Sequence, residues 1–285
     1  MSQAKTAIRR TGAADSAQMQ LRGKNKTWTF SSFVPYIAIF LLWEILSRLN
    51  IAAHWFNPLF FPPPTEVIRN GWQLAQTGII ADSLWSSTLR IAQGFLLGTV
   101  TAIAIAMFMS RFRIVEFWIS PLLNLTGPIP ALALLPLFII WFGIGEFPKV
   151  LLIAWTTFVP MLTYTLDGLK SVNPLLIRSA TSLGASQRQI FTRVILPSAI
   201  PNILVGSQVG LGLAFSALIV SEMMGASSGL GYIIVDARNY FKISNMFVAI
   251  VLIGLEYSLF SQLLKLVERR VMSWRKGGIR DALGK

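Results

Sequence analysis

The sequence predicts an all-α integral membrane protein with six transmembrane helices. Hydrophobic residues make up 54% of the 285-residue chain and charged residues only 13%, and the mean hydropathy is +0.61. Soluble domains carry about a quarter charged residues. Six long apolar segments follow one another along the chain, and a helix that crosses the bilayer needs about 20 mostly apolar residues. A bundle of membrane spans therefore explains the composition.

The predicted spans differ in how free they are of charge. They cover residues 33–49, 91–109, 117–144, 150–166, 200–220 and 246–264. The first is weakened by Pro35, Glu44 and Arg48. Glu44 and Arg48 are four residues apart, a spacing that allows an ion pair on one helix face. We therefore keep this segment as a span and expect a structural role for Glu44.

Two further features concern packing around the spans. Gly94 with Gly98, and Gly206 with Gly210, form Gly-x-x-x-Gly pairs that let helix backbones approach closely, within one subunit or between subunits. After three consecutive prolines, residues 66–75 place apolar side chains at helical spacing. This segment is either an interfacial helix or an irregular loop.

The positive charges indicate how the chain crosses the bilayer. Nineteen of the 25 Lys and Arg residues lie in the N-terminal tail, in the turn 110–116, in the loop 167–199 or beyond the last span. Because such charges stay on the cytoplasmic side, both termini are expected there. We expect one transmembrane domain at 33–270 between a basic, disordered cytoplasmic tail at 1–32 and a basic cytoplasmic tail at 271–285.

Several functional classes are disfavoured by what the sequence lacks. The net charge is +13, but the basic residues border apolar segments and form no stripe interleaved with aromatics, so the expected partner is the lipid bilayer and no nucleic acid. There is no cysteine, and the single histidine, His54, has no clustered carboxylates. No Gly-x-x-x-x-Gly-Lys-Ser/Thr phosphate loop occurs. We expect no catalytic, cofactor or metal site, and hence no enzyme.

The loop at 167–199 predicts two short helices around a glycine turn. Asn173 followed by Pro174 is typical of a helix start, because the Asn side chain caps the first turn and proline fits its first position. Gly184 can end this helix in a left-handed conformation. The second helix has its own start and stop signals.

These signals are a capping box and a proline. Ser186 and Gln189 are three residues apart, as the capping box requires. Pro197 is expected to break the second helix before the fifth span, because proline lacks the amide hydrogen that a helix interior needs.

The same loop carries a longer spaced pattern. Measured from Gly184, it includes Val194, Leu196 and Pro197. The pattern resembles the cytoplasmic signature of ABC importer permeases, which reads Glu-Ala-Ala, three residues, Gly, nine residues and Ile-x-Leu-Pro. Ala180 matches the second alanine of the signature. Arg178 and Ser179 depart from it, because they stand where the signature has Glu and the first Ala.

The resemblance covers about residues 61–274. The stretches 135–145 and 221–232, the Glu-Arg-Arg run at 268–270 and Trp274 are similar to the nitrate/sulfonate/taurine/bicarbonate-type branch of these permeases. The resemblance implies the type I ABC importer permease fold with a cytoplasmic coupling helix, in a bacterial inner membrane. It also implies a second permease copy, identical or different, two copies of an ABC ATPase subunit and an extracytoplasmic solute-binding protein.

The resemblance further implies which part of the loop couples the permease to the ATPase. The expected coupling residues, all within 173–197, are Asn173, Pro174, Leu175, Ile177, Arg178, Ser179, Ala180, Gly184, Arg188, Ile190, Phe191, Leu196 and Pro197. The helix that starts after Asn173 is expected to dock in a groove of the ATPase.

The resemblance favours a small anion as the transported solute. A sulfonate, taurine, nitrate or bicarbonate fits this branch, and a vitamin or aromatic precursor is the alternative. A stand-alone secondary transporter would carry repeated halves with broken helices and coupling-ion sites. The two halves of this sequence show no evident repeat, and the internal loop would have no purpose, so this class is disfavoured.

Two features are candidates for the translocation path. Gly127, Pro128 and Pro130 lie in the third predicted span, and the carbonyl groups that proline leaves unpaired must be buried in protein or face a wet cavity. This segment either lies beside the path or only kinks the helix. Glu256 lies near the middle of the last span, where a carboxylate is a functional candidate. Glu222 lies at a span edge, where water can solvate it.

Overall fold

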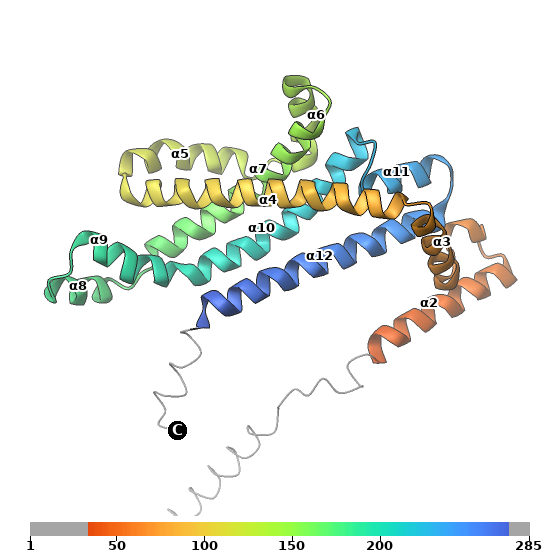
Figure 1. The fold of residues 1–285 in the computed structure, drawn as a ribbon, viewed down its shortest axis with the longest axis horizontal. Helices are drawn as coiled ribbons and strands as arrows, with labels where there is room; N and C mark the ends of the chain where they lie inside the picture. The colour runs from red at the N-terminus through yellow and green to blue at the C-terminus, as the bar shows by residue number, and fades with distance from the viewer. Residues whose placement is uncertain (1–33, 274–285) are drawn as a thin grey trace, which may run out of the picture. The chain divides into compact units, whose positions relative to one another are not determined.

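The computed structural model describes residues 34–273 (Figure 1). Residues 1–33 and 274–285 lie outside the described part. The predicted tail at 1–32 and the family-like Trp274 therefore fall outside it, as does the second tail apart from its first three residues. The described residues form two compact units that divide after Thr65.

Every regular element in the described part is a helix. The elements are α2 (Val34–Ala53), η2 (Pro58–Phe60), α3 (Pro64–Gln76), α4 (Ile79–Arg111), α5 (Arg113–Thr126), α6 (Ala131–Phe142), α7 (Glu146–Lys170), α8 (Pro174–Ser182), α9 (Gln187–Ile190), η3 (Phe191–Ile195), α10 (Leu196–Gly225), α11 (Leu230–Asn239) and α12 (Ile243–Val271). Helices α2, α4, α7 and α12, and the run from α9 to the end of α10, are each long and apolar enough to cross a membrane. The predicted all-α membrane fold is confirmed.

The third predicted span is broken. Where a continuous segment at 117–144 was expected, α5 and α6 are separate helices bent by 108°, so the described residues hold six spans if this bent pair counts as one. Gly127 ends α5, and Pro130 precedes α6 in an extended conformation with φ −61° and ψ 138°. Pro128 and Pro130 lack amide hydrogens, so the helical hydrogen bonds cannot continue through this segment. Proline thus separates two helices here instead of kinking one.

The first unit is held together by polar contacts around α2. Arg48 pairs with Glu44 at 2.6 Å, as their spacing predicted. Glu44 also accepts hydrogen bonds from the amide and the hydroxyl of Thr65, at 3.2 and 3.0 Å. The hydroxyl of Ser47 donates to the carbonyl of Pro62 at 3.4 Å. The charged residues that weakened the span prediction therefore fix α2 to the proline segment that follows it.

The core of the second unit is formed by α4, α7 and α10. Helix α7 packs against both of the others, and Ile91, Leu152 and Leu218 lie fully or almost fully buried in the resulting cluster. A second cluster around Met109 and Leu162 fills the other half of these helices. Because lipid is as apolar as these side chains, close packing rather than burial from water stabilises the bundle.

The predicted Gly-x-x-x-Gly pairs lie at these helix crossings. A Cβ atom on Gly94 of α4 would lie 2.6 Å from the Cβ atom of Ile153 on α7. A Cβ atom on Gly206 of α10 would lie 2.7 Å from the Cβ atom of Tyr164, also on α7. Both pairs therefore bring helices of the same subunit together, which answers the question that the sequence left open.

Two helical predictions have different outcomes. The helix expected at 66–75 is present as α3, which begins two residues earlier at Pro64, so the alternative of an irregular loop is wrong. The break expected at Pro197 is absent, because Pro197 lies in the first turn of α10, which follows α9 and η3 without interruption. The π-helical turn η3 precedes this proline, and such turns accommodate a residue that cannot join the regular hydrogen-bond ladder.

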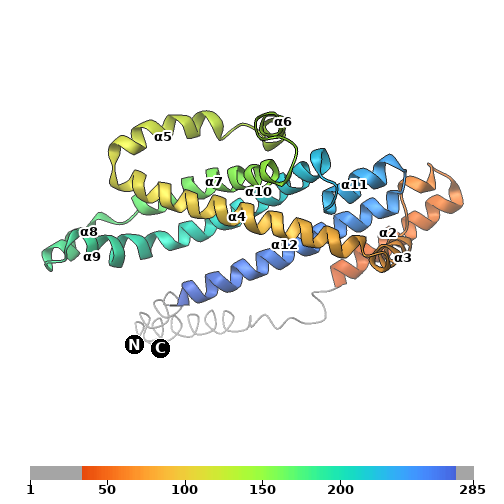
Figure 2. The ribbon, with the colours of Figure 1, turned by 45° about the horizontal axis from the view of Figure 1, so that its top comes forward.

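Different helices lie at the two ends of the second unit. Figure 2 shows α8 and α9 at one end, where α4 and α7 finish and α10 begins, and α11 at the other end. We call the first the loop end and the second the turn end, after the turn at 226–229 that joins α10 to α11.

Candidate functional site

The loop end contains the two short helices that the sequence predicted. Asn173 caps α8 by accepting a hydrogen bond from the amide of Leu175 at 2.9 Å, and Pro174 is the first residue of the helix. Gly184 follows the helix with φ +79°, in the left-handed region. Ser186 and Gln189 form a complete capping box for α9, with hydrogen bonds of 3.3 and 2.8 Å. These local predictions are confirmed.

Helix α8 exposes apolar side chains at the loop end. It has no buried residue. The side chains of Leu175 and Leu176 are 66% and 51% exposed, and Leu183 after the helix is 88% exposed. Within the described residues α8 packs against α9 and η3. Its apolar surface, together with the exposed Arg178, is free to contact another molecule.

The predicted coupling residues fall into two groups. Those on α8, and Arg188 on α9, are exposed or half-buried. Ile190 is buried, and Phe191, Leu196 and Pro197 are half-buried. The second group therefore attaches the loop to the bundle, and the first group presents most of the exposed surface of the loop.

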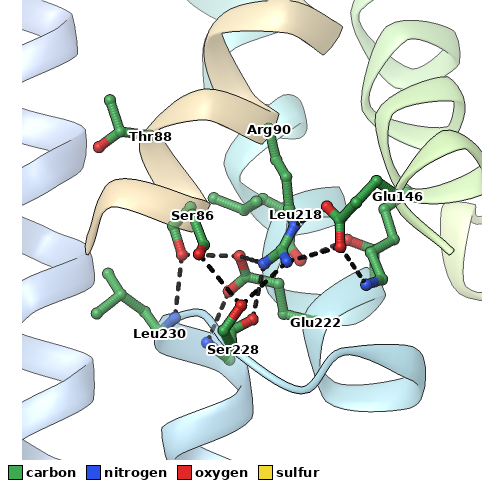
Figure 3. A network of polar contacts seen from close by, with 12 residues as sticks. Ser86, Thr88, Arg90, Glu146, Leu218, Glu222, Ser228 and Leu230 are labelled. Atoms are coloured by element: carbon green, nitrogen blue, oxygen red, sulfur yellow. Dashed lines mark hydrogen bonds and ion pairs between the residues drawn. The ribbon is translucent and has the colours of Figure 1, made fainter. Parts of the chain in front are cut away.

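The turn end holds a network of charged and polar side chains around Arg90 (Figure 3). Arg90, on α4, donates to both carboxylate oxygens of Glu146 from Nε and Nη2, at 2.5 and 2.9 Å. Its Nη1 donates to Glu222 on α10 at 2.8 Å and to the carbonyl of Ser228 at 2.7 Å. Lys149 also pairs with Glu146, at 2.9 Å. Two positive and two negative side chains thus balance at this point.

Glu222 is the centre of the second half of the network. It accepts hydrogen bonds from the hydroxyl of Ser87 at 2.7 Å and from the amide of Gly231 at 2.8 Å. The Ser87 oxygen in turn accepts from the amide of Leu230 at 3.0 Å. Gly229 has φ +123°, and a Cβ atom on it would overlap the Glu222 carboxylate. The turn after α10 therefore closes tightly over this carboxylate and joins α4 to the start of α11.

Burial makes this network important for stability. Arg90 is 4% and Glu222 1% exposed, whereas the side chain of Glu146 is 62% exposed. The expectation that water solvates Glu222 is wrong. Removing one partner of a buried ion pair costs about 3–5 kcal/mol, because the other charge stays buried. The network fixes the turn ends of three helices relative to one another.

Sequence reasoning did not single out Arg90, although a signal was available. Arg90 immediately precedes the second predicted span at 91–109, and Glu222 follows the fifth at 200–220. Both therefore belong at the same face of the membrane, where opposite charges at the same depth favour a pair. The partner could not be chosen from sequence, because several other charged residues border that face.

The two predicted path features do not contact each other in the described residues. Glu256 on α12 is 5% exposed and accepts a hydrogen bond from Thr88 on α4 at 2.9 Å, while its Oε2 atom has no hydrogen-bond partner in the described part of the chain. The bend at 127–130 is exposed, and a Cβ atom on Gly127 would lie 3.5 Å from Val159 of α7. The role of both in the path stays a prediction.

Comparison with known proteins places this architecture in a family. Residues 94–273 match the family described as binding-protein-dependent transport system inner membrane component. The chain belongs to this family. Its members are transport permeases, so the predicted class of membrane-spanning ABC importer permease is confirmed, and the chain is a multi-pass membrane permease.

Relatives and a solved structure agree with this assignment. A protein of Bacillus subtilis (strain 168) assigned as an aliphatic sulfonates transport permease is 32% identical, over 92% of this permease and 93% of the relative. The taurine transport system permease protein of Escherichia coli (strain K12) is 34% identical, over 82% and 85% of the two chains. A crystal structure of an amino acid ABC transporter superposes with a TM-score of 0.54 and 23% identity, over 71% of this permease and 96% of that chain, and supports the fold.

The segment that matches the family contains the whole α8–η3 loop but only part of the polar network around Arg90. All of the α8–η3 loop lies within residues 94–273, whereas the match begins after Arg90. The polar network therefore joins a residue outside the matched segment of the permease to Glu146 and Glu222 inside it.

Proposed function

We propose that this permease conducts aliphatic sulfonates such as taurine in an ATP-driven importer. The substrate assignment is supported by the similarity of nearly the whole chain to permeases for aliphatic sulfonates and for taurine, at 32% and 34% identity. A sulfonate is a small anion, the class that the sequence favoured. The vitamin-precursor alternative has less support, because a formylaminopyrimidine transport permease of Halalkalibacterium halodurans is 30% identical, over 85% of this permease.

In this proposal α8 is the coupling helix that docks on the ATPase. Its support is the exposed apolar surface of Leu175 and Leu176, with Arg178 beside them. Such side chains at a water-facing end of a membrane protein favour a protein partner. The assembly contains two permease copies, two ATPase copies and an extracytoplasmic solute-binding protein. Both termini of the permease and its loop end lie on the cytoplasmic side of the bacterial inner membrane.

The bend at 127–130 and Glu256 lie beside the translocation path. The bend supports this because its backbone is not helical and is exposed in the single chain, and such backbone at membrane depth must face protein or water. A second permease copy and a wet path between the copies would provide both. Glu256 supports it through the buried carboxylate oxygen that has no partner in the described residues.

The proposed function is tested by reconstitution. Proteoliposomes that contain the permease, its ATPase and its binding protein should accumulate labelled taurine when ATP is supplied. The control uses an ATPase whose phosphate-loop lysine is replaced, which should abolish uptake. Nitrate, bicarbonate and a vitamin pyrimidine precursor serve as competing solutes, and a preference for one of them would contradict the sulfonate assignment. Uptake by the permease alone, driven by an ion gradient, would contradict the ATP-driven class.

A further inference from the structure

A groove lies at the loop end of the second unit, between the junction of α4 with α5 and the segment formed by α9 and η3. Its volume is about 910 Å³, within the range of roughly 300–1,000 Å³ for ligand sites. The side chains that matter are Phe108, Arg111 and Phe112 on one wall and Arg188, Phe191 and Ile195 on the other. The groove is therefore a candidate binding site lined by two residues of the predicted coupling set, Arg188 and Phe191.

Both walls of the groove change from polar to apolar in the same direction. On α4, Arg111 is the last residue, and Phe108 lies one turn deeper in the span. On the opposite wall, Arg188 lies in α9, and Phe191 and Ile195 follow it towards the long apolar helix α10. Since α4 finishes and α10 begins at this end (Figure 1), the two arginines share the outer rim. The groove thus crosses the boundary between headgroups and hydrocarbon.

The charge of the groove is uncompensated. None of the ten residues that line it is Asp or Glu, and six of them are Met, Leu, Ile or Phe. Neither Arg111 nor Arg188 forms an ion pair within the described residues. The guanidinium of Arg111 lies 5.6 Å from the centroid of the Phe112 ring, a distance typical of a cation–π contact. The matching ligand carries an anionic group and an apolar chain.

We propose that this groove binds an anionic phospholipid, with the phosphate held by Arg111 and Arg188 and an acyl chain against Phe108 and Phe191. Guanidinium groups bind phosphate oxygens through paired, charge-assisted hydrogen bonds. Basic pockets between membrane helices on the cytoplasmic side suit anionic headgroups. A free phosphate ion would leave the apolar side chains uncovered, and a neutral lipid would leave the arginines without an anion. The assignment to the cytoplasmic leaflet rests on the orientation given under the proposed function.

The bound lipid contacts the base of the coupling loop. Arg188 is the second residue of α9, and the capping box at Ser186 fixes the start of this helix. A phosphate that holds Arg188 near Arg111 therefore joins the loop to the end of α4. Uptake by the complete importer should consequently be higher in membranes that contain anionic phospholipid than in neutral ones.

Lipid binding is measured on the purified full-length permease by native mass spectrometry. The detergent-solubilised protein is titrated with phosphatidylglycerol or with phosphatidylcholine, and we expect one phosphatidylglycerol per chain to be retained preferentially. The double variant R111Q/R188Q should bind it about tenfold or more weakly, because two charge-assisted contacts are lost. The variant F108S, at a side chain that is 59% exposed, should weaken phosphatidylglycerol binding without unfolding the protein.

The matched control is the double variant R113Q/R193Q. It removes the same charge from two exposed arginines at the same end that do not line the groove, and it should bind phosphatidylglycerol as the wild type does. Equal weakening in both double variants would overturn the proposal in favour of general surface attraction. Displacement by glycerol phosphate at equal concentration would overturn the role of the acyl chain.

Two further outcomes separate this inference from the proposed function. Displacement of the lipid by the added ATPase would assign the groove to that subunit and overturn the lipid site. Because the binding measurement uses the permease without transport, failure of taurine uptake would leave the lipid site intact. Conversely, absence of lipid binding alongside ATP-driven taurine uptake would overturn only the lipid site.

Discussion

The two ends of the second unit place arginine in opposite situations. At the turn end, Arg90 is 4% exposed, and its guanidinium is bound by two carboxylates and a carbonyl. At the loop end, Arg178 is exposed and forms no ion pair within the described residues, next to leucines that are also exposed. The first end pairs its buried arginine within the chain, whereas the second leaves Arg178 without an ion pair in the described residues. The difference separates residues that hold the permease together from residues that, in the proposed function, contact the ATPase.

The largest expected effect comes from disrupting the polar network at the turn end. The variant E222A removes a buried partner of Arg90 and the acceptor for Ser87 and the Gly231 amide, so the free energy of unfolding should fall by about 3–5 kcal/mol. Unfolding of the detergent-solubilised permease by a denaturing detergent measures this change. The comparison variant is E146Q, which alters a carboxylate of the same network that is 62% exposed and keeps an amide oxygen for Arg90 and Lys149, so its cost should be smaller than that of E222A. Equal costs would contradict the importance of burial.

The next effect concerns two glycines with nearly the same positive φ at different ends. Gly184 has φ +79° and Gly143 has φ +80°, and neither has an atom within 4 Å of an added Cβ. Valine should therefore cost each site about 1 kcal/mol or more of backbone strain. Only G184V should reorient α8, so ATP-dependent uptake and co-purification with the ATPase should fall in this variant alone. Normal transport in G184V would remove the loop from the coupling mechanism.

Charge reversal at the loop end should have a smaller effect. The variant R178E should weaken association with the ATPase about three- to tenfold, because an exposed pair worth up to about 1 kcal/mol is replaced by repulsion. Titration of the ATPase onto immobilised permease gives the dissociation constant. The control R193E makes the same change at an exposed arginine on η3, outside the expected coupling set, and should bind normally. Indistinguishable constants for the two variants would show that the ATPase does not contact Arg178.

The smallest expected change in stability is at Glu256. The variant E256Q keeps an oxygen for the hydrogen bond from Thr88 and alters only the side of the carboxylate that has no partner in the described residues. The free energy of unfolding should change by less than about 1 kcal/mol. If Glu256 lies beside the path, taurine uptake falls although stability is kept. Unchanged uptake in E256Q would place this residue outside the path.

Local signals predicted the loop end better than the turn end. The Asn173 cap, the Gly184 turn and the Ser186 capping box depend on residues at most a few positions apart, and each formed as expected. The pair of Arg90 with Glu222 spans 132 residues. No sequence pattern gives the relative rotation of α4 and α10, so this pair could be recognised only in the folded bundle.

Proline shows the limit of sequence reasoning within single helices. The prolines at 128 and 130 separate two helices that the continuous apolar segment at 117–144 had merged. Pro197 was expected to end a helix and instead lies inside a continuous one. Whether a proline ends a helix depends on whether the backbone before it can adopt a wider turn, as it does in η3. The presence of a proline in the sequence does not predict this.

The π-helical turn at Phe191–Ile195 sets an angular offset between the loop and the bundle. Successive residues of an α-helix are about 100° apart around its axis. One extra residue accommodated in a wider turn therefore rotates the segment before it by about that angle about the helix axis. The α8–α9 segment is thereby aimed independently of the face that α10 presents to α7. A permease shortened by one residue here would keep both helices but point α8 in another direction. On the proposal that α8 docks on the ATPase, such a deletion should disrupt docking without any change in the membrane core.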